Sequence, residues 1–184
     1  SFVRQLNHNR ETLQDEPFYM EQVVDTGLIE VALQYNGGFY ETTLAFANCI
    51  NTVDGGTHLA GFRAGLTRAI NNYAKKSKLI RDDQANFSGD DVREGLTSII
   101  SVRLEDPQFE GQTKGKLGNP EVRNQVETVV AEAGNMMYME TGMEMATALS
   151  MTGEDGGIFG KLFKAGKRML TGDSFFVTHY ANTS

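Results

Sequence analysis

The chain has 184 residues, 40% of them hydrophobic and 22% charged, which is the composition of a soluble globular protein with one domain, or one domain plus a fragment of another. Its formal net charge of −7 disfavours a protein that binds nucleic acid through its overall charge, although a local basic surface is compatible with it. No apolar run approaches the roughly 18 residues of a membrane span, and a single cysteine, Cys49, excludes an internal disulfide. We therefore expect a cytoplasmic protein, and a fragment, because the first residue is Ser1 rather than methionine.

The first third of the chain predicts a β-hairpin that follows the end of a helix at residues 2–6. From Leu28 to Asn36 apolar and polar residues alternate, which is the pattern of a half-buried strand. Asn36-Gly37-Gly38 has the composition of a turn, and a second extended run follows from Phe39 to Ile50. We interpret Cys49, in this second run, as a packing residue, because no basic neighbour in the sequence would stabilise its thiolate.

A long helix is predicted after Gly55-Gly56, with Thr57 as its N-terminal cap. Its core face carries apolar residues at helical spacing: Phe62, Leu66, Ile70 and Tyr73. A second face, polar and cationic, is either a solvated surface or a surface that meets a polyanion; it carries Arg63, Thr67, Asn71 and Lys75. We interpret His58 as a hydrogen-bonding cap residue rather than as a catalytic base.

Three further elements are predicted in the rest of the first part. Ser88, followed by Asp90 and Asp91, predicts the start of a short helix. Residues 96–104 alternate and predict a largely buried strand. Asn119-Pro120 predicts the start of another helix, whose buried side carries Val122, Val126, Val129 and Val130.

The predicted strand at residues 96–104 leads to a loop that contains Gln112-Thr113-Lys114. A lysine ammonium offers three hydrogen-bond donors and a glutamine amide two, so Gln112 and Lys114 could grip the terminal oxygens of a nucleoside triphosphate held elsewhere. The residues alone leave an alternative open, a polar surface loop, because these residue types are common at protein surfaces.

Four stretches of the chain carry a family resemblance: Ile29–Tyr35, Gly55–Phe62, Asp90–Leu96 and Pro107–Lys114. In this order they resemble the transducer region of the DNA gyrase B family, the ATPase-bearing components of bacterial type IIA topoisomerases. The resemblance covers residues 1 to about 127. It implies an α/β (α+β) fold with the left-handed βαβ arrangement that the family shares with GHMP kinases.

The resemblance also implies roles for three residues. Gln112 and Lys114 would reach into a neighbouring ATPase domain and contact the γ-phosphate of ATP, and Arg63 would face the cavity that accepts a DNA segment. Family members bind ATP and Mg²⁺ in a preceding GHKL domain, whose motifs are absent from this sequence. We therefore expect no catalytic and no metal-binding residue here and no ATP hydrolysis by the chain alone. The expected partners are DNA, gyrase A and a second copy of gyrase B.

The last third of the chain differs in composition, because seven of the eight methionines follow residue 127. Stretches such as Glu132–Met139 and Phe159–Gly172 resemble the amino-terminal part of a second family, known from altered inheritance of mitochondria, with a β-rich fold like that of the Trp RNA-binding attenuation protein. We therefore expect a transducer domain at residues 1–129, fused to a truncated β-rich segment at residues 130–184.

The hypothesis for function is a transducer that couples ATP occupancy in one domain to movement of the DNA gate. One alternative is a non-enzymatic module, in which the C-terminal β segment and its basic amphipathic stretch at 158–170 form an oligomer or a membrane-surface adaptor. A second alternative, a small-molecule enzyme of the GHMP-kinase type, is disfavoured because its glycine-rich phosphate loop is absent.

Overall fold

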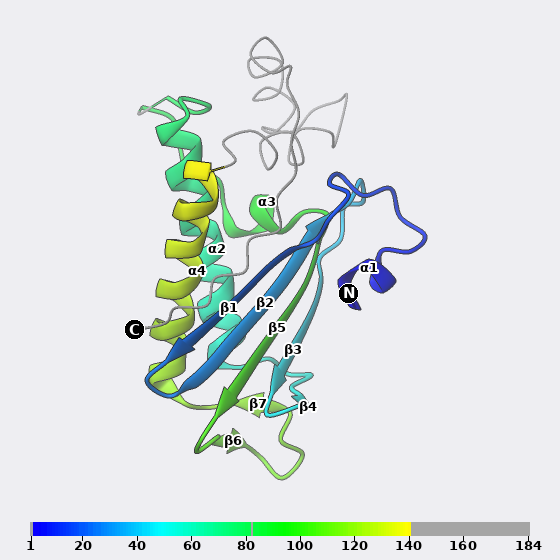
Figure 1. Ribbon diagram of the computed structural model, residues 1–184, viewed down its shortest axis with the longest axis vertical. Coiled ribbons are helices and arrows are strands. Elements are labelled where there is room, and N and C mark those ends of the chain that lie inside the picture. The colour runs from blue at the N-terminus through cyan, green and yellow to red at the C-terminus, as the bar shows by residue number, and fades with distance from the viewer. Residues whose placement is uncertain (1, 82, 141–184) are drawn as a thin grey trace.

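The computed structural model describes residues 2–81 and 83–140, with side chains up to residue 134. These residues form a mixed α/β fold, in which two long helices cover one face of a five-stranded sheet (Figure 1). The helices are α2 (Thr57–Lys76) and α4 (Pro120–Glu140). Of the two short helices, α1 (Phe2–Leu6) contacts β2 and β5, and α3 (Gly89–Arg93) directly precedes β5.

The sheet has the strand order β1-β2-β5-β3-β4. Its strands are β1 (Phe18–Val24), β2 (Gly27–Tyr35), β3 (Thr42–Ala47), β4 (Ile50–Asn51) and β5 (Leu96–Leu104). Strand β2 is antiparallel to both β1 and β5, whereas β3 is parallel to β5. Because the chain passes from β3 through α2 to its parallel neighbour β5, these elements form a βαβ unit.

The predicted hairpin between residues 28–36 and 39–50 is wrong, because β5 lies between β2 and β3. The turn residues explain the difference. The Asn36 backbone N–H donates to the Gly95 carbonyl, 2.9 Å away, and the Asn36 side chain donates to Thr97 Oγ1 at 3.1 Å. Asn36 therefore ties the end of β2 to the start of β5 instead of closing a turn. The hairpin partner of β2 is β1, which is a strand that no pattern described above predicts.

The core lies between the sheet and the two long helices. The predicted alternation of β2 is confirmed, since Ile29, Val31, Leu33 and Tyr35 are all buried. The core face of α2 is confirmed as well, with Phe62, Leu66, Ile70 and Tyr73 buried. Helix α4 contributes Val122, Val126 and Val130. Together these side chains remove enough apolar surface from water to hold the helices on the sheet.

Two glycines let α2 approach α4 closely. A Cβ atom at Gly61 would lie 2.3 Å from the Arg123 carbonyl oxygen, and one at Gly65 would lie 2.7 Å from the Glu127 carbonyl oxygen. Both distances are shorter than any normal contact of a Cβ atom. Every larger residue at these positions would therefore push the two helices apart.

Two local predictions are wrong and one is confirmed. Cys49 is exposed and lies with Asn48 in the turn between β3 and β4, where both residues have positive φ, as in a type I′ hairpin turn. Thr57 does not cap α2, because the N-cap is Gly56, whose φ of 138° an L-residue adopts only with strain. Ser88 caps α3 as predicted, through a capping box with Asp91.

Helix α4 runs to Glu140, so it continues across the boundary predicted at residues 129–130. The division into two domains at that position stays a prediction, because most of the second segment, residues 141–184, lies outside the described residues. Among the residues that were described, none of the helices is both long and apolar enough to span a membrane.

Candidate functional site

Residues 109–117, which contain Gln112 and Lys114, form a small hairpin at the end of the sheet where β5 ends (Figure 1). Its strands are β6 (Phe109–Glu110) and β7 (Lys116–Leu117), which pair antiparallel. The turn between them uses two residues with positive φ, Gly111 at 76° and Lys114 at 53°. Gln112, Thr113 and Lys114 are all exposed. The hairpin therefore presents the predicted phosphate-binding pair to solvent.

The two lysines of this hairpin have different surroundings. Lys116 Nζ forms an ion pair with Glu110 Oε2 at 2.9 Å. Lys114 Nζ lies 5.8 Å from the centre of the Phe109 ring, and no carboxylate in the described part of the chain lies within 4.0 Å of it. The ammonium of Lys114 is thus available to an external anion, whereas that of Lys116 already has a counterion.

The hairpin is fixed to the start of α2. The Leu117 N–H donates to the Gly55 carbonyl at 3.2 Å, and the Asp54 N–H donates to the Gly115 carbonyl at 2.9 Å. A Cβ atom at Gly56 would lie 2.5 Å from both the amide nitrogen and the carbonyl oxygen of Leu117, so only glycine permits this contact. Leu117 is fully buried. The Gly55-Gly56 pair therefore joins helix and hairpin.

Asn119 holds the other side of the hairpin. Its Oδ1 accepts a hydrogen bond from the Gln108 N–H at 2.7 Å, and its Nδ2 donates to the Asp106 carbonyl at 3.1 Å. We predicted Asn119 as a helix cap, and α4 does begin at the next residue. The side-chain oxygen, however, serves the segment that enters the hairpin.

His58 is neither a cap nor a base. Its side chain is fully buried, and Nε2 lies 3.1 Å from Thr52 Oγ1. Burial lowers the pKa of this imidazole from 6.5 to about 4. Because no solvent reaches the ring, His58 can neither take a proton from a substrate nor deliver one to it.

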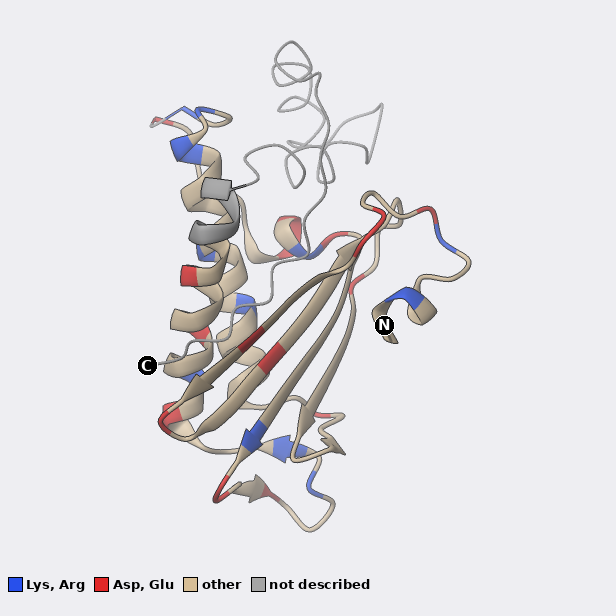
Figure 2. Ribbon diagram, viewed as in Figure 1, with Lys and Arg blue, Asp and Glu red and all other residues tan. Residues whose placement is uncertain are grey.

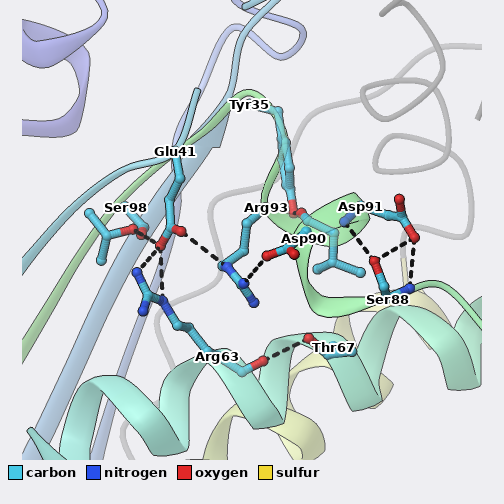
Figure 3. Close-up of polar contacts among 11 residues, drawn as sticks. Tyr35, Glu41, Arg63, Thr67, Ser88, Asp90, Asp91, Arg93 and Ser98 are labelled. Carbon is cyan, nitrogen blue, oxygen red and sulfur yellow. Dashed lines mark hydrogen bonds and ion pairs between the residues drawn. The ribbon is translucent and has the colours of Figure 1, made fainter. Parts of the chain in front are cut away.

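Arg63, the residue predicted to face DNA, lies on α2 and points towards the segment that precedes β3 (Figure 3). Its Nε and Nη2 donate to Glu41 Oε1 at 3.1 and 2.9 Å. Its side chain is 41% exposed. It lines an open pocket of about 470 Å³, whose other walls are Ala64, Thr67, Arg68, Asn71, Asn72, Asn86, Phe87 and Arg93.

Two residues of this region, Glu41 and Arg93, are not functional candidates in the sequence analysis, and a third, Asn71, is a candidate only as part of the polar face of α2. Glu41 also accepts a hydrogen bond from Arg93 Nε at 3.0 Å, and Arg93 forms a second ion pair with Asp90 (Figure 3). Asn71 was assigned to the polar face of α2, but it is buried and brackets Phe87, donating to its carbonyl and accepting from its N–H. No local pattern indicates the role of Glu41, because its partners Arg63 and Arg93 lie 22 and 52 positions away in the sequence.

The hairpin and the pocket are separate sites. The hairpin follows the end of β5 and the pocket lies beside α3, which precedes β5. Figure 2 shows basic residues on β5 and β7 and in the loop between β6 and β7. Within residues 2–81 and 83–140, no group of three or more histidine, cysteine, aspartate or glutamate side chains could hold a metal ion. The chemistry that both sites offer is the binding of anions by lysine, arginine and amide donors.

Comparison with protein families gives two matches. The model of DNA gyrase B matches residues 1–150, most of the chain. The model of mitochondrial biogenesis AIM24 matches residues 122–184, of which the structure describes only residues 122–140.

Curated relatives match over about three quarters of the chain. DNA gyrase B of Clostridium acetobutylicum is 53% identical over 133 residues, which are 72% of this chain and 21% of that protein. The gyrase B of Streptococcus pneumoniae is 49% identical over 140 residues, which are 76% of this chain and 22% of that protein. The chain thus spans about a fifth of the length of these relatives.

Two solved structures share the fold. The 43K ATPase domain of Thermus thermophilus gyrase B has a TM-score of 0.72 and 32% identity, over 91% of this chain and 42% of that one. The topoisomerase IV ATP-binding domain of Francisella tularensis has a TM-score of 0.66 and 27% identity, over 90% and 42%. Sequence and fold agree, and the chain belongs to the DNA gyrase B family.

Proposed function

We propose that this chain is the transducer part of an ATP-dependent type IIA topoisomerase. Gln112 and Lys114 contact the γ-phosphate of an ATP molecule that a separate GHKL domain binds together with Mg²⁺, and Arg63 faces the cavity that receives DNA. The βαβ unit of β3, α2 and β5 is the left-handed GHMP-kinase-like crossover of such a transducer. The observation that carries the proposal is the position of Lys114, exposed and without a carboxylate partner among the described residues on a hairpin fixed at both ends.

The donor set of the hairpin fits a terminal phosphate. Lysine and glutamine supply five donors between them, and the bond from a lysine to a phosphate oxygen is charge-assisted. We assign Mg²⁺, together with the ATP whose phosphates it binds, to the ATPase domain. That domain would also supply the base for hydrolysis, and the residues of this chain would sense the nucleotide.

The contacts of the hairpin support a mechanical link to the DNA cavity. Leu117 and Gly115 bond to the segment just before α2, and Arg63 lies in the second turn of that helix. A force applied to Lys114 by a bound phosphate would therefore reach Arg63 through a short, hydrogen-bonded path. The partners in this function are DNA, gyrase A and a second copy of gyrase B.

The test is a complete gyrase B protein that carries the hairpin of this chain. Lys114→Ala removes a charge-assisted hydrogen bond of about 1.5–3 kcal/mol, so the affinity for a non-hydrolysable ATP analogue should fall roughly ten- to hundredfold. ADP lacks the γ-phosphate, and its affinity should stay within about twofold. Gln112→Ala should act in the same direction but less, because the amide has no net charge.

Lys116→Ala is the matched control, because Lys116 lies two residues further on and is already paired with Glu110. It should leave both affinities unchanged. Equal losses for the ATP analogue and ADP, or an effect of Lys116→Ala as large as that of Lys114→Ala, would rule out the proposed γ-phosphate contact.

A further inference from the structure

The pocket beside α2 is lined by three arginines, each of which forms an ion pair with a carboxylate of the chain. Arg63 pairs with Glu41, Arg93 pairs with Glu41 and Asp90, and Arg68 pairs with Glu127. Three guanidinium groups thus face three carboxylates, and the six charges sum to zero. A DNA phosphate that enters the pocket meets arginines that already have counterions.

Glu41 is central to this arrangement, because it binds two of the three arginines (Figure 3). Its Oε1 accepts two hydrogen bonds from Arg63 and a third, at 2.8 Å, from the Thr43 hydroxyl, while its Oε2 accepts from Arg93. The Glu41 side chain is only 21% exposed. A carboxylate so placed is fixed by its neighbours and is weakly screened by salt.

Glu41 is hydrogen-bonded to the edge of the Arg63 guanidinium group that a phosphate would bind. The Nε and Nη2 groups form the side of the guanidinium that binds carboxylate or phosphate through two parallel hydrogen bonds. Glu41 occupies both groups of Arg63, and also the Nε of Arg93. A phosphate can bind this edge only if it displaces Glu41. Otherwise it can bind only the donors of the guanidinium group that Glu41 leaves free.

We propose that Glu41 is an internal competitor of the DNA backbone for Arg63 and Arg93, which keeps binding in this pocket weak and reversible. The inference rests on the proposed role of Arg63 in the DNA cavity and adds a positioning residue that regulates that role. Glu41 touches no DNA itself. It acts by holding the two guanidinium groups against the protein.

The central variant is Glu41→Gln, which keeps the shape of the side chain and the acceptor for Thr43 but removes the negative charge. It should strengthen binding of the full 184-residue chain to a short DNA duplex about tenfold at 20 mM salt, because one more phosphate contact becomes available. One such contact also steepens the dependence of log affinity on log salt by about 0.9, so the gain should shrink roughly eightfold between 20 and 200 mM salt. Fluorescence anisotropy of a labelled duplex measures both quantities.

Glu30→Gln is the matched control. Glu30 pairs with Arg103 at 3.0 Å, and its side chain is 20% exposed, so its exposure matches that of Glu41 and the change in net charge is identical. It lies on β2, on the face of the sheet away from the long helices, because its neighbours Ile29 and Val31 point into the core. Glu30→Gln should show only the small gain that any lost negative charge gives.

Arg63→Gln separates the inference from the function on which it rests. If Arg63→Gln weakens DNA binding and Glu41→Gln strengthens it more than Glu30→Gln does, the inference is supported. If Arg63→Gln weakens binding but Glu41→Gln gives no more than Glu30→Gln, the inference alone is refuted. If Arg63→Gln has no effect, the assignment of Arg63 to DNA fails and the inference fails with it.

A combined variant and a conservative variant complete the test. Glu41→Gln together with Arg63→Gln and Arg93→Gln should lose most of the gain, because both freed guanidinium groups are gone, and a gain that persists would refute the mechanism. Thermal unfolding shows whether each variant is folded. Should Glu41→Gln fail to fold, Glu41→Asp, which keeps the charge but is too short to hold both arginines, should still raise affinity, and unchanged or weaker binding would overturn the proposal.

Discussion

The buried histidine at the start of α2 makes the stability of the fold depend on pH. His58 is fully buried, its Nε2 bonds to Thr52, and its Nδ1 has no hydrogen-bond partner in the described part of the chain. Burial lowers its pKa from 6.5 to about 4, because the charged ring would lose its hydration. In the folded protein the ring therefore stays neutral down to about pH 4.

The sign of the effect follows from proton uptake. In the unfolded chain His58 binds a proton as the pH falls below its ordinary value of 6.5, whereas in the folded chain it does so only near pH 4. Protons therefore favour the unfolded state between these values, and the free energy of unfolding falls as the pH falls. Its slope reaches about 1.4 kcal/mol per pH unit, and the whole loss amounts to about 3 kcal/mol. Above pH 6.5 the full stability is present.

Urea unfolding followed by circular dichroism tests this between pH 7 and pH 5, above the range in which most carboxylates titrate. His58→Gln keeps a polar group near Thr52 but cannot take up a proton, so its stability should lose about 2 kcal/mol less than that of the wild type over this interval. His8→Gln, at an exposed position, is the control and should keep the wild-type dependence. Equal pH dependence for the wild type and His58→Gln would show that His58 takes up its proton over the same pH range in the folded and the unfolded chain, and would refute the reasoning.

Two further predictions concern the packing around α2. Gly61→Ala places a Cβ atom 2.3 Å from the Arg123 carbonyl oxygen and should lower the free energy of unfolding by about 1–3 kcal/mol. Gly37→Ala is the control and should be nearly neutral, because its Cβ atom would meet only the Glu11 carbonyl oxygen, at 3.9 Å. Thermal unfolding measures both effects. Asn71→Ala removes the two hydrogen bonds that the Asn71 side chain makes to the N–H and the carbonyl of Phe87 and should cost about 1–3 kcal/mol, with faster proteolysis near Phe87, whereas the exposed neighbour Asn72→Ala should change neither. A loss in Gly37→Ala or Asn72→Ala equal to that of its partner variant would mean that the close contacts described here do not set the stability.

The sequence predicts those elements whose signal is local. Strand β5 lies where the alternation of residues 96–104 places it, and the apolar spacing of α2 identifies its buried face. The cap of α3 is equally local, since Ser88 and Asp91 bond to each other. Such elements can be predicted without the rest of the chain, because the period of the apolar residues or a short capping motif defines them.

The pairing of segments that lie far apart in the sequence cannot be predicted from the local pattern of residues. The hairpin predicted around Asn36 is wrong because Asn36 bonds to Gly95 and to Thr97, which lies 61 positions away, and β5 inserts beside β2. The exposed turn at Cys49 lacks the Asn-Gly or Asp-Gly signal of a tight hairpin. Glu41 has no periodic context, and its partners Arg63 and Arg93 lie 22 and 52 positions away. The family resemblance predicts a role for Arg63, but only the folded structure shows that Arg63 is hydrogen-bonded to Glu41.

Strand β5 and helix α2 each connect the β6–β7 hairpin to the pocket that Arg63 lines. Strand β5 begins next to α3, where Arg93 lies, and ends at the segment that leads into the β6–β7 hairpin. Helix α2 begins at the bonds to Gly115 and Leu117, and it carries Arg63 in its second turn. Because no Cβ atom fits at Gly56, hairpin and helix start touch through backbone atoms, which cannot rotate away as side chains can. A displacement of the hairpin must therefore either break these hydrogen bonds or move the start of α2 with it.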